Sequence, residues 1–398
     1  MRLDRVRQPR PVSVCIGGDG PRLYMFDPKT LDVLGQFSLP PRAPLAPGTS
    51  LFQDFTGGGY FFLDNRDRVW SATTTRHVWV IAERRGSPGF VLRRDYDLSR
   101  ALRSDERITS ALPDSSGRIW FVAKRNGVVG TIARRSGRIR LRRLGRGRTG
   151  EIENSFATAS HDVYIATNRK MYRFRAGRGG RPQIVWKARY RNSGLTKPGQ
   201  VDDGTGTTPT VLQGGYVAIT DNDDPMNVVV YRTAVHPRHG RRLVCRVPVF
   251  RRGASATEES LVGAGRSLIV ENNYGYQDPF GPMSGAVTEP GFARVDIERG
   301  GRGCRRRWTN RTERAPTTVP KLSLATGLIY AYTRPPDPGG SQPYFWTALD
   351  FRTGRRVWRQ LAGRGLNYNN NYAGIAIGRD GTAYLGTLLG GIVAIRDG

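Results

Sequence analysis

The chain alternates short apolar segments with glycine-containing turns, and this alternation repeats along its length. Each repeat begins with a small or polar residue, continues with a short apolar segment and a glycine turn, and resumes with a segment rich in Tyr, Val and Ile. The pattern is clear in "NSFATASHDVYIATN" from Asn154, "ESLVGAGRSLIVENN" from Glu259 and "KLSLATGLIYAYT" from Lys321. Short apolar runs bounded by turn residues predict β-strands. We therefore expect an all-β chain.

Seven repeats begin at residues 54, 110, 154, 208, 259, 321 and 371, at spacings of 44 to 62 residues. Four antiparallel strands that recur at about 50 residues are typical of a β-propeller, whose blades bury their faces against one another. Residues 1–398 are predicted to form a single propeller domain. A half-repeat at the N terminus favours eight blades, whereas merging the two incomplete ends gives seven. With eight blades, the first blade lacks its innermost strand, as if the natural chain began upstream of Met1.

One outer hairpin, "YFWTALDFRTGRRVWRQ" from Tyr344, has an Asp before a Thr-Gly turn and a Trp after it. Together with the preceding "GLIYAYT", this Ala-Leu-Asp, Thr-Gly and Trp pattern resembles the repeat of quinoprotein-type (PQQ-repeat) propellers. The resemblance implies the propeller fold. Dehydrogenases of that family bind their quinone with an adjacent cysteine pair and a stacking Trp. This sequence has no adjacent cysteines, so PQQ is not expected.

Polar residues gather at positions that a propeller places on one rim. In an antiparallel blade, the start of the innermost strand lies beside the end of the second strand. Carboxylates and amides occupy these positions in several repeats, which predicts a polar channel mouth. The expected ligand-binding residues are Asp54, Asn154, Asp221, Asn222, Asn273, Tyr274, Asn370 and Asn371. The expected catalytic residues are Glu259, Glu271 and Lys321.

Carboxylate and amide oxygens from several blades suit a hard cation such as Ca²⁺, and they can equally bind the hydroxyl groups of a sugar. The arrangement resembles calcium-dependent propellers of the gluconolactonase and paraoxonase type. That resemblance implies a calcium site whose ligands are Glu259, Glu271, Asn154 and Asn272. The alternative is that the Asn and Asp residues cap turns by bonding to nearby backbone groups.

Two segments are too long to be hairpin turns and belong on the same rim: "RYRNSGLTKPGQVDDGTGTTP" before Thr210 and "NNYGYQDPFGPMSGAVTEPGF" from Asn272. Loops of this length inside a compact domain are often binding loops or lids. We therefore expect them to cover a ligand. The side chains available for this are Tyr274, Tyr276, Phe280, Lys197 and Asp202.

The formal charge is +30, and only 6 of the 63 basic residues are Lys. The Arg residues are scattered, which favours a solvated basic surface over a face that binds a polyanion or a protein. No nucleic-acid-binding motif is present, and no apolar run approaches the roughly 18 residues that cross a bilayer. Cys245 and Cys304 either form a bridge, which favours an oxidising compartment, or remain free thiols. The protein is extracytoplasmic if an upstream leader is missing, and cytoplasmic otherwise.

Two functions are compatible with these patterns. The first is a propeller that binds a small polar ligand, such as a sugar or a lactone, at the channel mouth. As an enzyme it would be a metal-assisted hydrolase of lactonase or esterase type, or a lyase, with Glu259 or Glu271 as base. Quinone-dependent oxidation is not expected. The second function is a non-enzymatic binding or scaffold propeller for a protein or a polyanion.

Overall fold

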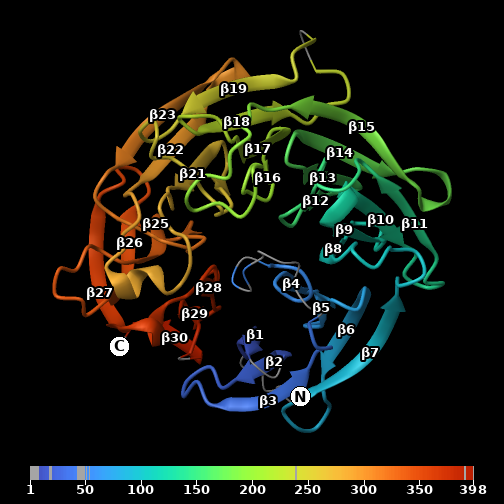
Figure 1. Ribbon diagram of the computed structural model, residues 1–398, viewed down its shortest axis with the longest axis horizontal. Helices are drawn as coiled ribbons and strands as arrows, with labels where there is room; N and C mark the ends of the chain where they lie inside the picture. Colours follow the sequence, from blue (N-terminus) through green and yellow to red (C-terminus); the bar gives the residue numbers. More distant parts are fainter. Residues whose placement is uncertain are drawn as a thin grey trace, which may run out of the picture.

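The computed structural model describes residues 9–17, 20–42, 50, 52, 54–237, 240–389 and 391–397, which form a ring of eight antiparallel sheets (Figure 1). The chain travels once round the ring, so that the first and last sheets are neighbours. Six sheets have four strands, and the two terminal sheets have three. The eight-bladed propeller predicted from the repeats is therefore confirmed. The seven-blade alternative, which merges the terminal repeats into one sheet, is wrong.

Within each sheet the strands follow one another in chain order. The first four sheets contain β1 (Val12–Gly17), β2 (Gly20–Phe26) and β3 (Val33–Ser38); β4 (Phe61–Leu63), β5 (Val69–Ala72), β6 (His77–Glu83) and β7 (Phe90–Asp97); β8 (Ile108–Pro113), β9 (Ile119–Ala123), β10 (Val128–Ile132) and β11 (Ile139–Arg143); β12 (Ala157–Ala159), β13 (Asp162–Ala166), β14 (Lys170–Ala176) and β15 (Pro182–Arg189). The other four contain β16 (Thr210–Leu212), β17 (Tyr216–Thr220), β18 (Asn227–Arg232) and β19 (Leu243–Pro248); β20 (Val262–Ala264), β21 (Ser267–Glu271), β22 (Phe292–Ile297) and β23 (Cys304–Asn310); β24 (Lys321–Ser323), β25 (Leu328–Thr333), β26 (Pro343–Asp350) and β27 (Arg356–Arg364); β28 (Ala376–Ile377), β29 (Ala383–Thr387) and β30 (Gly391–Ile395).

The helices of the described residues are short 3₁₀ turns: η2 (Arg125–Gly127), η3 (Arg178–Gly180), η5 (Gly281–Ser284), η6 (Arg299–Gly301) and η7 (Leu366–Tyr368). In the described part of the chain, no helix has the length and apolar character needed to cross a membrane.

The middle strands are apolar on both faces, because each sheet lies between two neighbouring sheets. All residues of β9, β10 and β13 are buried, for example. The outermost strands expose charged side chains instead, as Arg93 and Arg94 do on β7 and Arg305 does on β23. Each fully buried aliphatic side chain contributes about 1.5–3 kcal/mol to stability. The basic residues of these outer strands are therefore compatible with a well-packed interior.

The hairpin between β26 and β27 shows why Asp, Thr and Gly occur together in its turn. Asp350 Oδ1 accepts hydrogen bonds from the backbone N–H and the hydroxyl of Thr353, at 2.6 and 2.7 Å. Gly354 has a φ of +72°, and a Cβ at this position would lie 2.4 Å from the ring of Trp308. The turn predicted at Thr353 and Gly354 is present, and a larger residue would not fit at its glycine.

A disulfide joins Cys245 on β19 to Cys304 on β23, the outermost strands of two adjacent blades. Of the two states that the sequence allowed, the structure therefore has the bridge. A bridge between blades restrains their separation at the edge of the ring. Such bonds persist in oxidising compartments.

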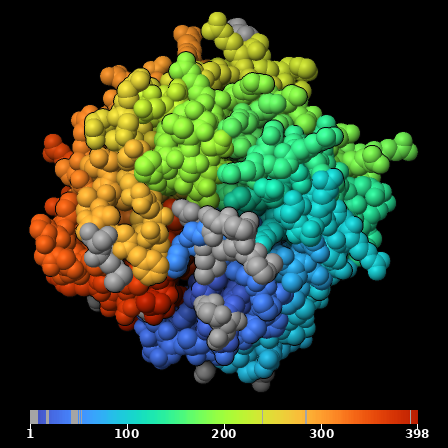
Figure 2. Space-filling model, in the orientation of Figure 1, coloured from blue at the N-terminus to red at the C-terminus, as the bar shows by residue number. Residues whose placement is uncertain are grey.

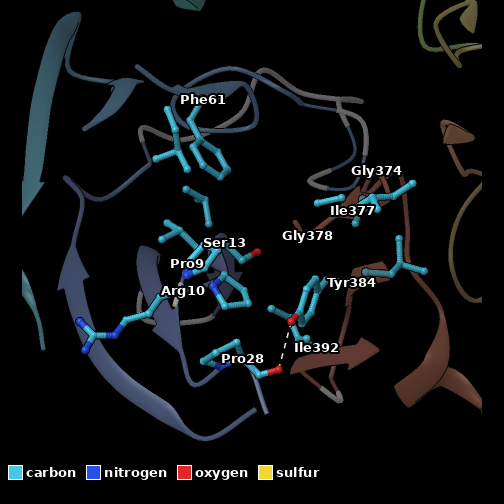
Figure 3. A pocket seen from close by; sticks show the side chains of 18 of the residues that line it. Pro9, Arg10, Ser13, Pro28, Phe61, Gly374, Ile377, Gly378, Tyr384 and Ile392 are labelled. Atoms are coloured by element: carbon cyan, nitrogen blue, oxygen red, sulfur yellow. Dashed lines mark hydrogen bonds between the residues drawn. The ribbon is translucent and has the colours of Figure 1, made fainter. Parts of the chain in front are cut away.

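The first sheet has no strand inside β1, which pairs with β2 alone among the described residues. A cavity of about 520 Å³ lies along this edge, between β4 and β28 (Figure 3). Its lining includes Val12, Phe61 and Ile377, and it occupies the place that an innermost strand takes in the other seven sheets. A second cavity of about 330 Å³ adjoins β1 and is lined by Phe55 and Tyr372.

Candidate functional site

Three buried glutamates lie at the inner rim of one blade. Glu258 and Glu259 precede β20, and Glu271 ends β21. Because Val262 pairs with Ile269 in this hairpin, the residues before β20 lie beside the end of β21. Glu258, Glu259 and Glu271 are 7%, 2% and 1% exposed. The rim of this blade therefore holds three carboxyl groups that are shielded from water.

Burial raises the pKa of all three carboxyl groups, because a charged carboxylate is poorly stabilised away from water. The pKa of Glu259 is raised to about 8. The pKa of Glu271 is raised by burial and then by the charge of Glu259. For Glu258, burial is the largest cause, followed by the charge of Asp202.

Four oxygens of these groups have no hydrogen-bond partner among the described residues: Glu258 Oε2, Glu259 Oε1, and Oε1 and Oε2 of Glu271. A buried carboxyl group in this state binds a proton, a donor or a cation. Asn273, which follows this strand, is also fully buried, and its Oδ1 has no partner within the described chain. The site thus presents several unsatisfied acceptors.

A second acidic group comes from the blade of β12. Glu153 lies at the same place relative to β12 as Glu258 does relative to β20, and it forms an ion pair with Lys124. Burial raises the pKa of Glu153 to about 7. Burial likewise raises the pKa of Asp202, which is 4% exposed, to about 6. The central channel of a protein with a charge of +30 is thus locally acidic.

Four aromatic rings border the same space. Tyr60, Phe55, Tyr372 and Tyr276 form a chain of contacts, with successive ring centroids 6.0, 5.2 and 5.6 Å apart. After burial, the charge of Glu258 is the next cause of the raised pKa of both Tyr60 and Tyr372. The rings and the carboxyl groups therefore share one part of the channel.

Two amides predicted to bind a ligand hold these rings in place. Asn154 Oδ1 accepts a hydrogen bond from the hydroxyl of Tyr60 at 2.7 Å. Asn371 Oδ1 accepts one from the hydroxyl of Tyr276 at 2.9 Å. Both amides therefore reach the channel, where they position aromatic side chains.

The loop of residues 190–209 closes one side of the site. The backbone N–H of Val201 donates to Glu258 Oε1 at 2.9 Å. Gly199 packs against Asn273, whose Nδ2 donates to the Gly199 carbonyl at 3.3 Å. Gly199 has a φ of +101°, and a Cβ there would lie 2.5 Å from the carbonyl oxygen of Asn273. Only glycine allows the loop to approach the site this closely.

The loop of residues 272–291 crosses toward the last blade. Asn369 Nδ2 donates to the Pro279 carbonyl at 3.1 Å, and the rings of Phe52 and Phe280 are 5.4 Å apart. In Figure 2 this yellow-orange loop meets the blue segment before β4 at the centre of the face. Of its predicted ligand-covering residues, Tyr276 is buried against Tyr372, whereas Phe280 is 49% exposed.

Four other predicted residues bond to protein groups: Asp221 caps its own turn, as the alternative interpretation expects, whereas Asn222, Asn272 and Asn370 join separate segments of the rim. Asn272 and Asn370 donate their amide hydrogens to backbone carbonyls. Asn222 does the same, and Asp221 accepts hydrogen bonds from the backbone and side chain of Asn227. These side chains stabilise the rim, although the Oδ1 atom of Asn222 has no hydrogen-bond partner within the described chain.

Three further predicted residues lie elsewhere on the rim. Lys321 begins β24 and is exposed, and no ion pair joins it to an acid within the described chain. Asp54 accepts a hydrogen bond from the hydroxyl of Thr56 and lies 3.4 Å from Arg107 Nη1. Tyr274 is half-buried at the start of the 272–291 loop. The structure does not bring these three side chains to the glutamates.

Sequence reasoning missed Glu153, Glu258, Lys124, Tyr60 and Tyr372. A signal for the two glutamates was present, because both stand in a Glu-x-Ser sequence just before an innermost strand. The two tyrosines follow irregular segments and carry no comparable signal.

Two of the predicted calcium ligands bond to protein groups in this structure. Among the described residues, no three His, Cys, Asp or Glu side chains are grouped closely enough to hold a metal ion. Asn272 uses its amide on the backbone, and Asn154 accepts from Tyr60. Calcium at this rim stays a prediction.

No protein-family model matches the chain. A protein of Archaeoglobus fulgidus, described as uncharacterized, is 28% identical over 270 residues, covering 60% of this chain and 51% of that protein. The chain thus matches about half the length of this relative.

Solved propellers are similar in fold. Dihydro-heme d1 dehydrogenase NirN in complex with DHE has a TM-score of 0.56 at 12% identity, covering 97% of this chain and 70% of NirN. Selenomethionine-substituted virginiamycin B lyase from Staphylococcus aureus has a TM-score of 0.51 at 11% identity, and the match covers 87% of this chain and 96% of the lyase. At these identities the likeness shows the fold alone, and the quinoprotein-type repeat remains a resemblance.

Proposed function

We propose that the protein binds a small polar ligand beside the buried glutamates at the inner rim. Glu271 carries the proposal, because it is 1% exposed and both of its carboxyl oxygens lack a partner among the described residues. An unsatisfied buried acceptor costs about 1–3 kcal/mol. Such a cost is commonly retained where a function requires the group. Hydrogens of a ligand would satisfy Glu259 and Glu271 together.

If the ligand is chemically transformed, the same glutamates supply acid–base catalysis. Two carboxyl groups that disfavour each other's charge hold a proton between them near neutral pH. A pKa of about 8 for Glu259 suits a group that both accepts and returns a proton. General acid–base catalysis of this kind is compatible with hydrolysis or a lyase reaction of a hydroxylated substrate, such as a sugar or a lactone. A purely binding role uses the same contacts without proton transfer.

A thermal-shift screen tests the proposal. The purified protein is heated with a panel that includes sugars, sugar lactones, small amines and CaCl₂. A ligand present at 100 times its Kd stabilises the folded state by about 2.7 kcal/mol. We expect at least one compound to raise the Tm of the wild type and of Glu298→Gln, an exposed control, but not of Glu271→Gln. The proposal is wrong if no compound acts, or if the active compounds stabilise Glu271→Gln equally.

A further inference from the structure

The class of ligand can be narrowed from the bonding capacity of the channel. The unsatisfied oxygens of Glu258, Glu259 and Glu271 are acceptors when ionised. The nearby hydroxyls of Tyr60 and Tyr276 already donate to amide oxygens. A neutral polyol needs donors for its own oxygens as well as acceptors, whereas an ammonium group needs acceptors or negative charge alone. The channel therefore matches a cation better than a neutral molecule.

The aromatic rings add a second, independent reason. The faces of aromatic rings attract cations, and several rings around one space bind organic ammonium groups. Tyr60, Phe55, Tyr372 and Tyr276 contact one another in series at the side of the glutamates. A bare metal ion gains less from such rings than from oxygen ligands. No group of three acidic, His or Cys side chains that could hold a metal occurs in the described chain.

The backbone of residues 371 and 372 indicates that the position of Tyr372 matters. Asn371 and Tyr372 are consecutive non-glycine residues with φ values of +32° and +69°. Each such conformation costs about 1–3 kcal/mol and is kept mainly at functional sites. Tyr372 also lines the 330 Å³ cavity beside β1, so it stands between that cavity and the glutamates. An uncharged part of a ligand can therefore extend past Tyr372 into the cavity.

We propose that the natural ligand is an organic cation, with an ammonium head group bound between the buried glutamates and the four aromatic rings. This inference rests on the proposed function of the channel and narrows its ligand class. Lys124, the cation paired with Glu153, does not neutralise the set of Glu258, Glu259 and Glu271. Burial favours the protonated form of these three carboxyl groups. A cation held against them favours the ionised form, so the head group would bind with release of a proton to solvent.

Calorimetric titration with choline tests the proposal directly. The matched control compound is its neutral isostere, in which a tert-butyl group replaces the trimethylammonium group. We expect choline to bind at least about tenfold more tightly than the isostere, which corresponds to the roughly 1–2 kcal/mol of a desolvated cation–π and charge interaction. Tyr372→Leu is expected to bind choline about tenfold more weakly than the wild type does. Tyr372→Phe keeps the ring and is expected to bind as the wild type does, which separates loss of the ring from misfolding.

The alternative outcomes are distinguishable. If choline and the isostere bind equally, or if myo-inositol binds in a Glu271-dependent manner while choline does not, the cation assignment is wrong and the proposed function stands. If CaCl₂ binds in a Glu271-dependent manner and choline does not, the ligand is a metal ion and the inference is overturned. If no compound shows Glu271-dependent binding, the proposed function fails together with the inference.

Discussion

Replacing Glu259 with Gln should make the stability of the protein less sensitive to pH. The folded protein raises the pKa of this carboxyl group from 4.5 to about 8, so it holds a proton that the unfolded chain releases. A group of this kind contributes its full stability below about pH 4.5, and that contribution is lost as the pH rises through about 8. At 1.36 kcal/mol for each pKa unit, the loss reaches about 5 kcal/mol. Gln cannot ionise, and its amide can donate a hydrogen bond to Glu271.

The assay compares the Tm of the wild type and of Glu259→Gln from about pH 5 to about pH 9. For 398 residues, the entropy of unfolding converts about 5 kcal/mol into roughly 6 °C. We expect Glu259→Gln to gain about this much relative to the wild type across the range, while Glu298→Gln, an exposed control, follows the wild type. A Tm difference between wild type and Glu259→Gln that stays constant with pH would refute the reasoning, because Glu259 would then ionise as freely in the folded protein as in the unfolded chain.

Two further changes test other parts of the structure. Lys124→Met leaves Glu153 buried without its cation. The free energy of unfolding should fall by about 3 kcal/mol at about pH 8, and by less at about pH 6, where Glu153 is protonated. Urea unfolding at both pH values measures this, and an equal loss of stability at both would contradict it. Replacing Cys245 and Cys304 together with Ala opens a loop of 59 residues and should cost about 4 kcal/mol. A Tm equal to that of the wild type under non-reducing conditions would show that the bridge does not stabilise the ring.

The fold was readable from the sequence because a propeller repeats one local pattern. Each blade needs short apolar strands and glycine turns, and both features recur from repeat to repeat even where the residues themselves differ. The hairpin at Asp350, Thr353 and Gly354 was predictable for the same reason, since its residues bond to their own turn. The sequence also predicted the place of Glu259 and Glu271, because strand ends share a rim.

The residues that form the candidate site were less predictable, because the direction in which each side chain points matters there more than its position in the sequence. Asn272 follows Glu271 directly, yet its amide bonds to the backbone while the carboxyl of Glu271 stays unsatisfied. Both residues looked equivalent as ligands in the sequence. The position of Tyr372 depends on positive φ angles at residues 371 and 372, and no pattern of residues in the sequence predicts such a backbone conformation. The orientation of residues outside regular strands, such as Tyr372, depends on packing between blades and is not written in a local pattern.

A crystal structure of the protein with choline tests the central claim most directly. The account predicts density for the trimethylammonium group against the carboxyl groups of Glu259 and Glu271 and the ring of Tyr372. Density for the trimethylammonium group in the cavity beside β1, away from the glutamates, or a structure in which these carboxyl groups contact only one another, would contradict it.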